Sequence, residues 1–340
     1  MQRCLELAAM GLGNAAPNPL VGCVIVHDDK IVGEGYHHQA GQPHAEVNAI
    51  DSVKNKKLLS KSILYVNLEP CAHYGKTPPC ANLIVQNKIP KVVIGNIDPH
   101  VKVAGKGTNI LKMNGTEVVT GVLEDHCRHL NRRFFCFQEK KRPYVVLKWA
   151  QTVDGFIDRD RQPDEKPHPN WITGEYARML VHKWRTEEQS IMVGTKTAVL
   201  DNPRLNVRNW FGRNPIRLLI DREGKTNDSH YLLNDEVLTY VFTEKVRTSK
   251  EKTHFIRKNF NENLLQEILH FLYAQEIQSV FVEGGAALLN SLINSGLWDE
   301  ARVFIGEKEF KSGVKAPVIK KQAIKKMKIN NDLLYYYSNH

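Results

Sequence analysis

The chain has 340 residues, 42% of them hydrophobic and 25% charged, which is the balance of an ordinary globular protein. No apolar run approaches the roughly 18 residues that a membrane-spanning helix needs, and the N-terminus lacks the features of a secretory signal, so we expect a cytoplasmic protein. The net charge of +10 is compatible with nucleic acid or with small anionic substrates, but the lysines near the C-terminus lack interleaved arginine and aromatic residues and are interpreted as a solvated face.

Residues 1–125 alternate helix and strand signals. Apolar residues at helical spacing predict a helix over 1–10, and two β-branched segments around the Asp28-Asp29 turn predict a hairpin of 22–27 and 31–36. The other predicted elements, in chain order, are a helix over 44–53, a strand over 63–68, a helix over 80–87, a strand over 91–95, a helix over 110–114 and a strand over 117–120. Strands separated by helices indicate an α/β layer structure.

Residues 126–143 are basic and end at Pro143, which stops any helix. After them the alternation of strands and helices begins again. The predicted strands are 144–149, 190–193, 216–221, 237–242, 279–282 and 301–305, and the predicted helices are 176–187, 263–275 and 286–295. We therefore expect two α/β domains, 1–130 and 144–340, joined by a linker over 131–143.

The sharpest motif is His44-Ala45-Glu46, followed by Pro70-Cys71 and Pro79-Cys80. One histidine and two cysteines can give three ligands to a tetrahedral Zn²⁺ and leave the fourth position for water. Helix N-termini favour the thiolate form, and Glu46 is close enough to shuttle a proton for that water. Zinc deaminases share this arrangement, although eight residues separate the cysteines here rather than two.

Each of these residues alone is more typical of a buried thiol or a core histidine. In combination, with a proline before each cysteine and Glu46 in place, they predict zinc. Without a secretory signal we expect a reducing compartment rather than disulfides. The remaining cysteines are interpreted as packing residues: Cys4, Cys23, Cys127 and Cys136.

With these motifs, the sequence resembles the family of bifunctional riboflavin-biosynthesis deaminase/reductases. The resemblance is carried by 17–26, 33–37, 44–46 and 68–80, of which 68–80 is the most specific because related deaminases have the shorter cysteine spacing. It implies an N-terminal cytidine-deaminase-like αβα domain that acts on a phosphoribosylated diaminopyrimidinone. It also implies that the substrate pocket is lined by Asn18, His37, His73 and Lys76.

The second half resembles the reductase half of the same enzymes, a dihydrofolate-reductase-like α/β domain that uses NADPH. The matching segments include 147–148, 171–174, 201–203 and 282–285. Gly284-Gly285 follow a strand and open a helix, so the backbone could approach a phosphate there, although a simple strand-to-helix turn is the alternative. The implied cofactor contacts are Ala150, Trp171, Thr197, Asp201, Gly285, Ala286, Ala287, Leu288, Leu289, Asn290 and Ser291.

The substrate contacts that the resemblance implies in this half are Arg185, Leu205, Arg208 and Glu283. Two arginines suit a phosphate because a guanidinium forms forked hydrogen bonds. The chain departs from the family at 159–170, a charged and proline-rich stretch where the family has a shorter small and polar segment. His168-Pro169-Asn170 stand directly before the tryptophan, so the local substrate contact is expected to differ.

We therefore predict a bifunctional enzyme of riboflavin biosynthesis with Zn²⁺ and NADPH as cofactors. The first domain would hydrolytically deaminate a diaminohydroxy phosphoribosylaminopyrimidine, with Glu46 moving the proton, and the second would reduce the ribosyl group to ribityl. The expected partners are phosphorylated pyrimidine substrates and further copies of the chain, with neither nucleic acid nor membrane. Two alternatives stay open: a nucleic-acid-editing deaminase with an accessory domain, and a deaminase with a degenerate reductase scaffold.

Overall fold

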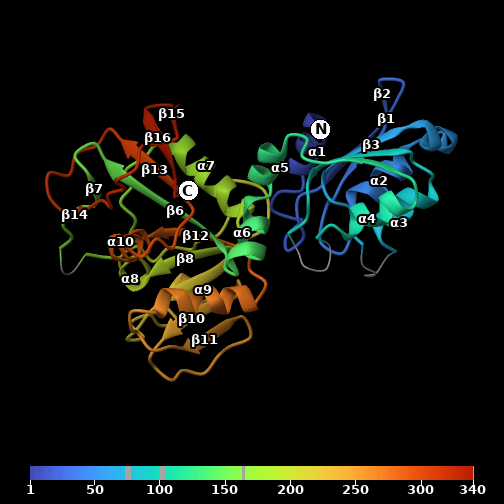
Figure 1. Cartoon of the computed structure of the whole chain (residues 1–340). Helices are drawn as coiled ribbons and strands as arrows, with labels where there is room; N and C mark the ends of the chain where they lie inside the picture. The colour runs from blue at the N-terminus through green and yellow to red at the C-terminus, as the bar shows by residue number, and fades with distance from the viewer. Residues whose placement is uncertain (73–77, 100–103, 163–164, 340) are drawn as a thin grey trace. The chain divides into compact units, whose positions relative to one another are not determined.

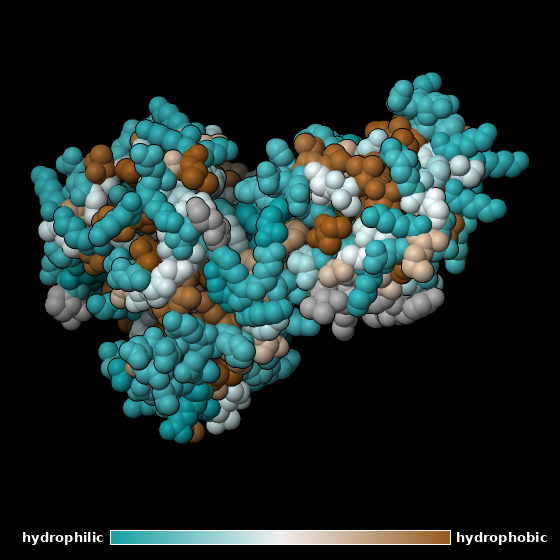
Figure 2. Space-filling view, in the orientation of Figure 1, coloured by the Kyte–Doolittle hydropathy of each residue, from teal (hydrophilic) through white to brown (hydrophobic). Residues whose placement is uncertain are grey.

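The computed structural model describes residues 1–72, 78–99, 104–162 and 165–339. The chain divides into two compact units, Met1–Lys141 and Arg142–His340, and each unit has a sheet of its own (Figure 1). None of the described helices combines the length and the hydropathy that crossing a bilayer requires. On the face seen in Figure 2, hydrophilic residues predominate and hydrophobic residues show as separate patches.

The first unit is built on a mixed five-stranded sheet in the order β2-β1-β3-β4-β5. β1 runs antiparallel to β2 and β3, whereas β3, β4 and β5 are parallel to one another. The strands are β1 (Gly22–His27), β2 (Lys30–Tyr36), β3 (Ile63–Leu68), β4 (Lys91–Asn96) and β5 (Glu117–Val119). The parallel strands β3 and β4 end at the same edge of the sheet, where the segment with Cys71 begins.

Helices cover both faces of this sheet. Because side chains alternate along a strand, Cys23 and Ile25 of β1 pack with α2, α3 and α4, while Val24 packs with α1 on the other face. The described helices of this unit are α1 (Gln2–Ala9), α2 (Ala45–Ser52), α3 (Cys80–Gln86), α4 (Lys106–Met113), α5 (Glu124–Leu130), α6 (Arg132–Lys140) and the short 3₁₀ helix η1 (Lys56–Lys61). The unit is therefore a three-layer αβα structure.

The second unit contains a nine-stranded sheet in the order β11-β10-β9-β8-β12-β6-β13-β16-β15. All strands from β11 to β13 are parallel, and β16 and β15 add an antiparallel hairpin at one edge. The strands are β6 (Tyr144–Thr152), β8 (Ser190–Gly194), β9 (Ile216–Ile220), β10 (Thr239–Thr243), β11 (Thr253–Arg257), β12 (Ser279–Gly284), β13 (Glu300–Gly306), β15 (Lys325–Ile329) and β16 (Asp332–Ser338), with β7 (Phe156–Asp158) and β14 (Val314–Lys315) as a separate pair.

Its helices are also divided between the two faces of the sheet. α9 and α10 bury Ile268, Leu272 and Leu289 against β6, β8 and β12. On the other face, the Trp184 ring of α7 lies 5.6 Å from the Phe304 ring and 6.2 Å from the Phe281 ring. The helices are α7 (Glu175–Glu187), α8 (Thr195–Asp201), α9 (Leu264–Ala274), α10 (Ala286–Asn294) and the 3₁₀ helix η2 (Tyr231–Leu233).

Several elements differ from the sequence prediction: α4 begins at Lys106 rather than at 110, and α5, α8, β7, β11, β14, β15 and β16 were not predicted. Two basic segments are further examples. The range 131–143 contains helix α6, which buries Phe134, Phe135 and Phe137 and ends before the unit boundary at Lys141. The C-terminal lysines are exposed, as expected for a solvated face, and 325–328 lie on strand β15. Three lysines obscure the strand pattern of β15, whereas α6 does carry an apolar face and was assigned to a linker because of its basic residues and Pro143.

Candidate functional site

His44, Cys71 and Cys80 converge in the first unit. His44 directly precedes α2, Cys71 follows β3 and Cys80 is the first residue of α3. Nδ1 of His44 lies 3.6 Å from Sγ of Cys71 and 3.4 Å from Sγ of Cys80, and all three ligand atoms lie within 4.8 Å of one another. Ligands of a tetrahedral zinc ion with bonds of roughly 2.0–2.3 Å are separated by about 3.6 Å, so this set of one imidazole and two sulfurs fits zinc.

The two cysteines are electrostatically unequal. The backbone N–H of Cys80, at the start of α3, donates to Sγ of Cys71 over 3.3 Å. Hydrogen bonding from the Cys80 thiol and from His44 lowers the pKa of Cys71 to about 4, despite the opposing effect of burial. The same pairing raises the pKa of Cys80. The site therefore already stabilises a thiolate, the form in which cysteine binds a metal.

Glu46 lies in the first turn of α2 and is only 3% exposed. Burial, together with the negative charge of Cys71, raises the pKa of this carboxyl to about 7. A carboxyl with a pKa near neutrality can accept a proton and return it within one catalytic cycle. The position and the environment of Glu46 therefore suit the proton shuttle that the sequence predicts.

Asn18 and His37 lie beside the metal ligands. Nδ2 of Asn18 is 3.0 Å from Nε2 of His37, whose Nδ1 is 3.0 Å from the carbonyl oxygen of Pro43. An amide nitrogen only donates and a carbonyl only accepts, so His37 is neutral with its proton on Nδ1. Burial lowers the pKa of His37 in agreement, and its ring meets the His44 ring edge-on at 5.4 Å. The other two predicted contacts, His73 and Lys76, lie outside the described residues.

Glu69 is a supporting residue whose role sequence reasoning missed. Its buried carboxylate accepts hydrogen bonds from the backbone N–H groups of Gly105 and Thr108, both at 2.9 Å. The start of α4 is thereby tied to the segment that continues into Cys71. The sequence signal was a charged residue directly after the buried strand β3, since a carboxylate in that position needs several donors.

A cavity of about 1930 Å³ opens in the second unit at the carboxyl ends of β6, β8 and β12. In open α/β sheets this is the usual place for ligands. The predicted substrate contacts all line it: Arg185, Leu205, Arg208 and Glu283. Of the predicted cofactor contacts, Asn290 does not line the described cavity, whereas these residues do: Ala150, Trp171, Thr197, Asp201, Gly285, Ala286, Ala287, Leu288, Leu289 and Ser291.

A buried charge network forms the floor of this cavity. Nε and Nη2 of Arg185 donate to the two carboxylate oxygens of Glu283 at 2.6 and 3.0 Å, and Nζ of Lys148 lies 3.7 Å from the same carboxylate. Burial alone would raise the pKa of Glu283, but Arg185 and Lys148 outweigh it and lower the pKa to about 2. Lys148 received no role from the sequence, although a lysine inside the apolar strand 144–149 was a visible signal.

The two predicted phosphate-binding arginines lie near each other. Arg185 donates to the backbone carbonyl of Asn206 at 3.0 Å, and Arg208 donates to its side-chain oxygen at 3.2 Å. Nδ1 of His182, on α7, accepts from the backbone N–H of Arg208 at 3.3 Å. Burial and the positive charges of Arg185 and Arg208 lower the pKa of His182 to about 4. The neutral histidine therefore leaves a cationic surface that suits a phosphate.

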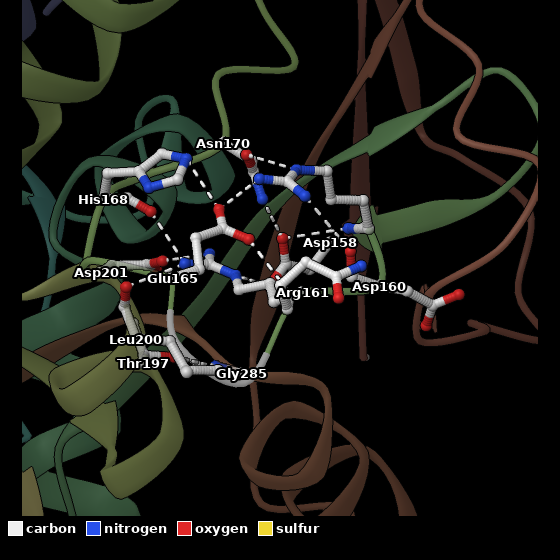
Figure 3. Close-up of polar contacts among 12 residues, drawn as sticks. Asp158, Asp160, Arg161, Glu165, His168, Asn170, Thr197, Leu200, Asp201 and Gly285 are labelled. Atoms are coloured by element: carbon white, nitrogen blue, oxygen red, sulfur yellow. Dashed lines mark hydrogen bonds and ion pairs between the residues drawn. The ribbon is translucent and has the colours of Figure 1, made fainter.

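The opposite side of the cavity is formed by α8 and the turn into α10. Oγ1 of Thr197 accepts a hydrogen bond from the backbone N–H of Gly285 at 3.0 Å (Figure 3). Gly285 has a φ of 24°, and a Cβ there would lie 3.2 Å from Thr197 Oγ1, so glycine permits this close approach. The Trp171 ring is 48% exposed, and the guanidinium of Arg178 lies 5.0 Å from its centroid.

Comparisons with known proteins cover nearly the whole chain. Residues 143–326 match the family model of the RibD C-terminal domain, and residues 1–96 match that of the cytidine and deoxycytidylate deaminase zinc-binding region. The riboflavin biosynthesis protein RibD of Aquifex aeolicus is 39% identical over 322 residues, which is 92% of this chain and 88% of that protein. RibD of Actinobacillus pleuropneumoniae is 40% identical over 320 residues, covering 91% and 83%.

Solved structures point to the same family as the sequence comparisons. The diaminohydroxyphosphoribosylaminopyrimidine deaminase/5-amino-6-(5-phosphoribosylamino)uracil reductase of Thermotoga maritima superposes with a TM-score of 0.89 at 35% identity, covering 99% of this chain and 96% of that one. Acinetobacter baumannii RibD gives a TM-score of 0.86 at 33% identity, covering 98% and 96%. The predicted fold class, a cytidine-deaminase-like αβα domain followed by a dihydrofolate-reductase-like α/β domain, is confirmed. The chain belongs to the RibD family of riboflavin biosynthesis proteins.

Proposed function

We propose that the first unit hydrolytically deaminates a diaminohydroxy phosphoribosylaminopyrimidine and that the second reduces the ribosyl group of the product to ribityl with NADPH. The observation that carries this proposal is the presence of two separate sets of chemical groups in one chain. The His44–Cys71–Cys80 cluster with Glu46 suits a zinc deaminase. The cavity of the second unit holds two arginines for a phosphate and a glycine turn beside Thr197 for a nucleotide.

In the deaminase, the protein's own groups move the protons. His44, Cys71 and Cys80 would hold zinc, which would supply the Lewis acidity that makes water nucleophilic at neutral pH. Glu46 takes a proton from the water that adds to the amino-bearing ring carbon. It gives this proton to the ring nitrogen, then takes the proton of the added hydroxyl and gives it to the amino group, which leaves as ammonia while the oxygen becomes a carbonyl. The neutral His37 orients the Asn18 amide, whose oxygen and second N–H can form hydrogen bonds with the pyrimidine next to the ligands.

In the reductase, the protein mainly orients its ligands and stabilises charge. NADPH would supply the hydride to the open-chain form of the sugar, and solvent would supply the proton that completes the gain of two hydrogens. Arg185 and Arg208 bind the substrate phosphate, and Glu283 holds the Arg185 guanidinium in a fixed plane. A forked, charge-assisted contact of this kind fixes orientation as well as affinity. Trp171, α8 and the start of α10 would hold the cofactor, and Thr197 and Gly285 shape the turn there.

The finer expectations stay predictions. These are the absence of nucleic-acid partners, a homo-oligomer, and a cytoplasmic location. The family match favours the bifunctional enzyme over a nucleic-acid-editing deaminase, because the RibD C-terminal domain occupies the place of an accessory domain.

One experiment tests the proposal. The full-length, zinc-loaded protein is incubated with the diaminopyrimidine phosphate, with and without NADPH, and the products are identified by mass. Without NADPH, we expect replacement of one amino group by oxygen; with NADPH, we expect the further gain of two hydrogens. A product that is deaminated but never reduced would support the degenerate reductase instead. An unchanged substrate in both reactions would contradict the proposal.

A further inference from the structure

The segment 159–170, which departs from the family pattern, is ordered by its own side chains in its described part, 159–162 and 165–170. Asn170 donates to the carboxylate of Asp158, at the end of β7, and its side-chain oxygen accepts from Nε of Arg159 at 3.3 Å. Arg159 also pairs with Glu165, whose carboxylate lies 3.2 Å from Nε2 of His168. Figure 3 shows this cluster beside Leu200 and Asp201 of α8, both of which line the cavity. The described part of this segment therefore lies next to the cavity.

Arg161 connects this segment to the cavity wall. Its side chain is only 10% exposed. Nε donates to Asp158 at 2.8 Å, and Nη1 donates to the carbonyl oxygens of His168 and Leu200 at 2.9 and 2.8 Å. Nη2 donates to Oδ1 of Asp201 at 2.5 Å. Four donated hydrogen bonds to two carboxylates and two carbonyls hold the guanidinium in one orientation.

α8 is therefore held at both ends. At its first turn, Thr197 bonds to the backbone of Gly285, as described above. At its last turn, the carbonyl of Leu200 accepts from Arg161 and also from the backbone N–H of His168, at 2.8 and 3.0 Å. The helix then ends at Asp201, and the next residue has a φ of 41°. Without Arg161, the last turn would lose its cationic partner at the negative end of the helix.

The charge of Asp201 also depends on Arg161. Asp201 lines the cavity, its side chain is 27% exposed, and its Oδ2 has no hydrogen-bond partner among the described residues. An isolated carboxylate in this place would repel the phosphates of a nicotinamide nucleotide. Arg161 neutralises this charge through Oδ1 and leaves Oδ2 available as an acceptor for a ligand hydroxyl or amide.

We propose that Arg161 is a positioning residue for the nicotinamide nucleotide, which acts by fixing Asp201 and the last turn of α8. This inference rests on the proposed function, since it assigns the nucleotide to the α8 side of the cavity. Arg159 provides the matched comparison. It has the same charge and lies in the same segment, but its side chain bonds to Asp160, Glu165 and Asn170 rather than to α8.

The test compares Arg161→Gln with Arg159→Gln in the full-length protein. The kcat and both KM values are measured with pre-deaminated substrate, and the Kd for NADPH is measured by fluorescence titration. For Arg161→Gln we expect the KM and Kd for NADPH to rise about tenfold or more, because hydrogen bonds to charged groups are lost. The kcat and the KM for the pyrimidine should change by less than about threefold. Arg159→Gln should leave all four values near those of the wild type.

Two further variants separate positioning from general destabilisation. Arg161→Lys keeps the charge and should recover part of the NADPH affinity. In an Asp201→Asn background, Arg161→Gln should weaken NADPH binding less than it does in the wild type, because the part of its effect that passes through Asp201 is already lost. Identical behaviour of the Arg161 and Arg159 variants, or additive effects of Arg161→Gln and Asp201→Asn, would overturn the inference. A wild-type protein that does not bind NADPH would instead refute the proposed reductase itself.

Discussion

Among single residues, Glu46 offers the most direct test of the deaminase. Glu46→Gln keeps the size and the hydrogen-bonding capacity of the side chain but removes the base. We expect ammonia release to fall roughly 100-fold or more, while zinc stays bound by His44, Cys71 and Cys80. Zinc content is measured in parallel by atomic absorption. The exposed Glu124→Gln is the control, and a zinc-loaded Glu46→Gln enzyme with near-normal activity would contradict the assignment.

The stability of the second unit should depend on pH through the protonation of His182. Its pKa in the folded protein is about 4, below the ordinary value of 6.5. Between these pH values the unfolded chain binds more protons, so the stabilising contribution is present above about pH 6.5 and is lost as the pH falls towards 4. Asparagine keeps an acceptor for the Arg208 backbone but does not titrate. In His182→Asn, the free energy of unfolding should therefore fall by about 2 kcal/mol less between pH 7 and pH 5 than in the wild type.

Calorimetric unfolding of both proteins at several pH values provides the measurement. Other titrating groups contribute equally to both proteins, so the difference between the two pH profiles isolates His182. Parallel profiles would show that His182 is not held neutral in the folded protein.

At the level of elements, α4 controls the segment that carries Cys71. A Cβ on Gly107 would lie 2.0 Å from the carbonyl oxygen of Pro70, the residue before that ligand. Gly107→Ala must therefore displace either α4 or the ligand segment. We expect the purified variant to retain substantially less zinc per chain and to lose deaminase activity, while reductase activity persists. Asn109→Ala, an exposed change on the same helix, should retain its zinc.

The sequence predicted the elements whose pattern is strongly apolar. The strand over 63–68 coincides with β3, and the range 176–187 covers nearly all of α7, because buried strands and amphipathic helices bury regularly spaced apolar side chains. α8 and the β15–β16 hairpin were missed. α8 has only seven residues, and three of the five residues of β15 are lysines, so neither shows the periodicity of its class. β16 was missed even though its segment Leu333–Tyr337 is apolar and aromatic.

Site residues, too, were predicted where a sequence pattern marks them and missed where none does. Residues that belong to a motif were found: His44, Cys71 and Cys80 do converge. The roles of Lys148, His182 and Arg161 were not predicted, because each depends on partners far away in the chain. Arg161 meets Asp201 forty residues later, and no local pattern shows that contact.

For the whole molecule, we predict that the two activities can be separated. Each unit has its own sheet and its own buried core, and neither candidate site uses described residues of the other unit. Cys71→Ser should abolish deamination yet leave the reduction of pre-deaminated substrate largely intact. NADPH oxidation is compared in wild-type and variant protein whose circular dichroism spectra agree. Loss of reduction in the folded, zinc-free variant would show that the sites depend on each other.

The lysines of β15 have a consequence for the behaviour of the protein at high concentration. β15 is the last strand of its sheet, so one side of it presents unpaired backbone groups that another chain could extend. Lys325, Lys326 and Lys328 place repelling charges along that border. Behind them, β16 contains Leu333–Tyr337, a run of apolar and aromatic residues with high β-propensity. The basic strand thus shields an aggregation-prone neighbour, and a chain shortened to expose β16 would tend to self-associate through intermolecular β-pairing.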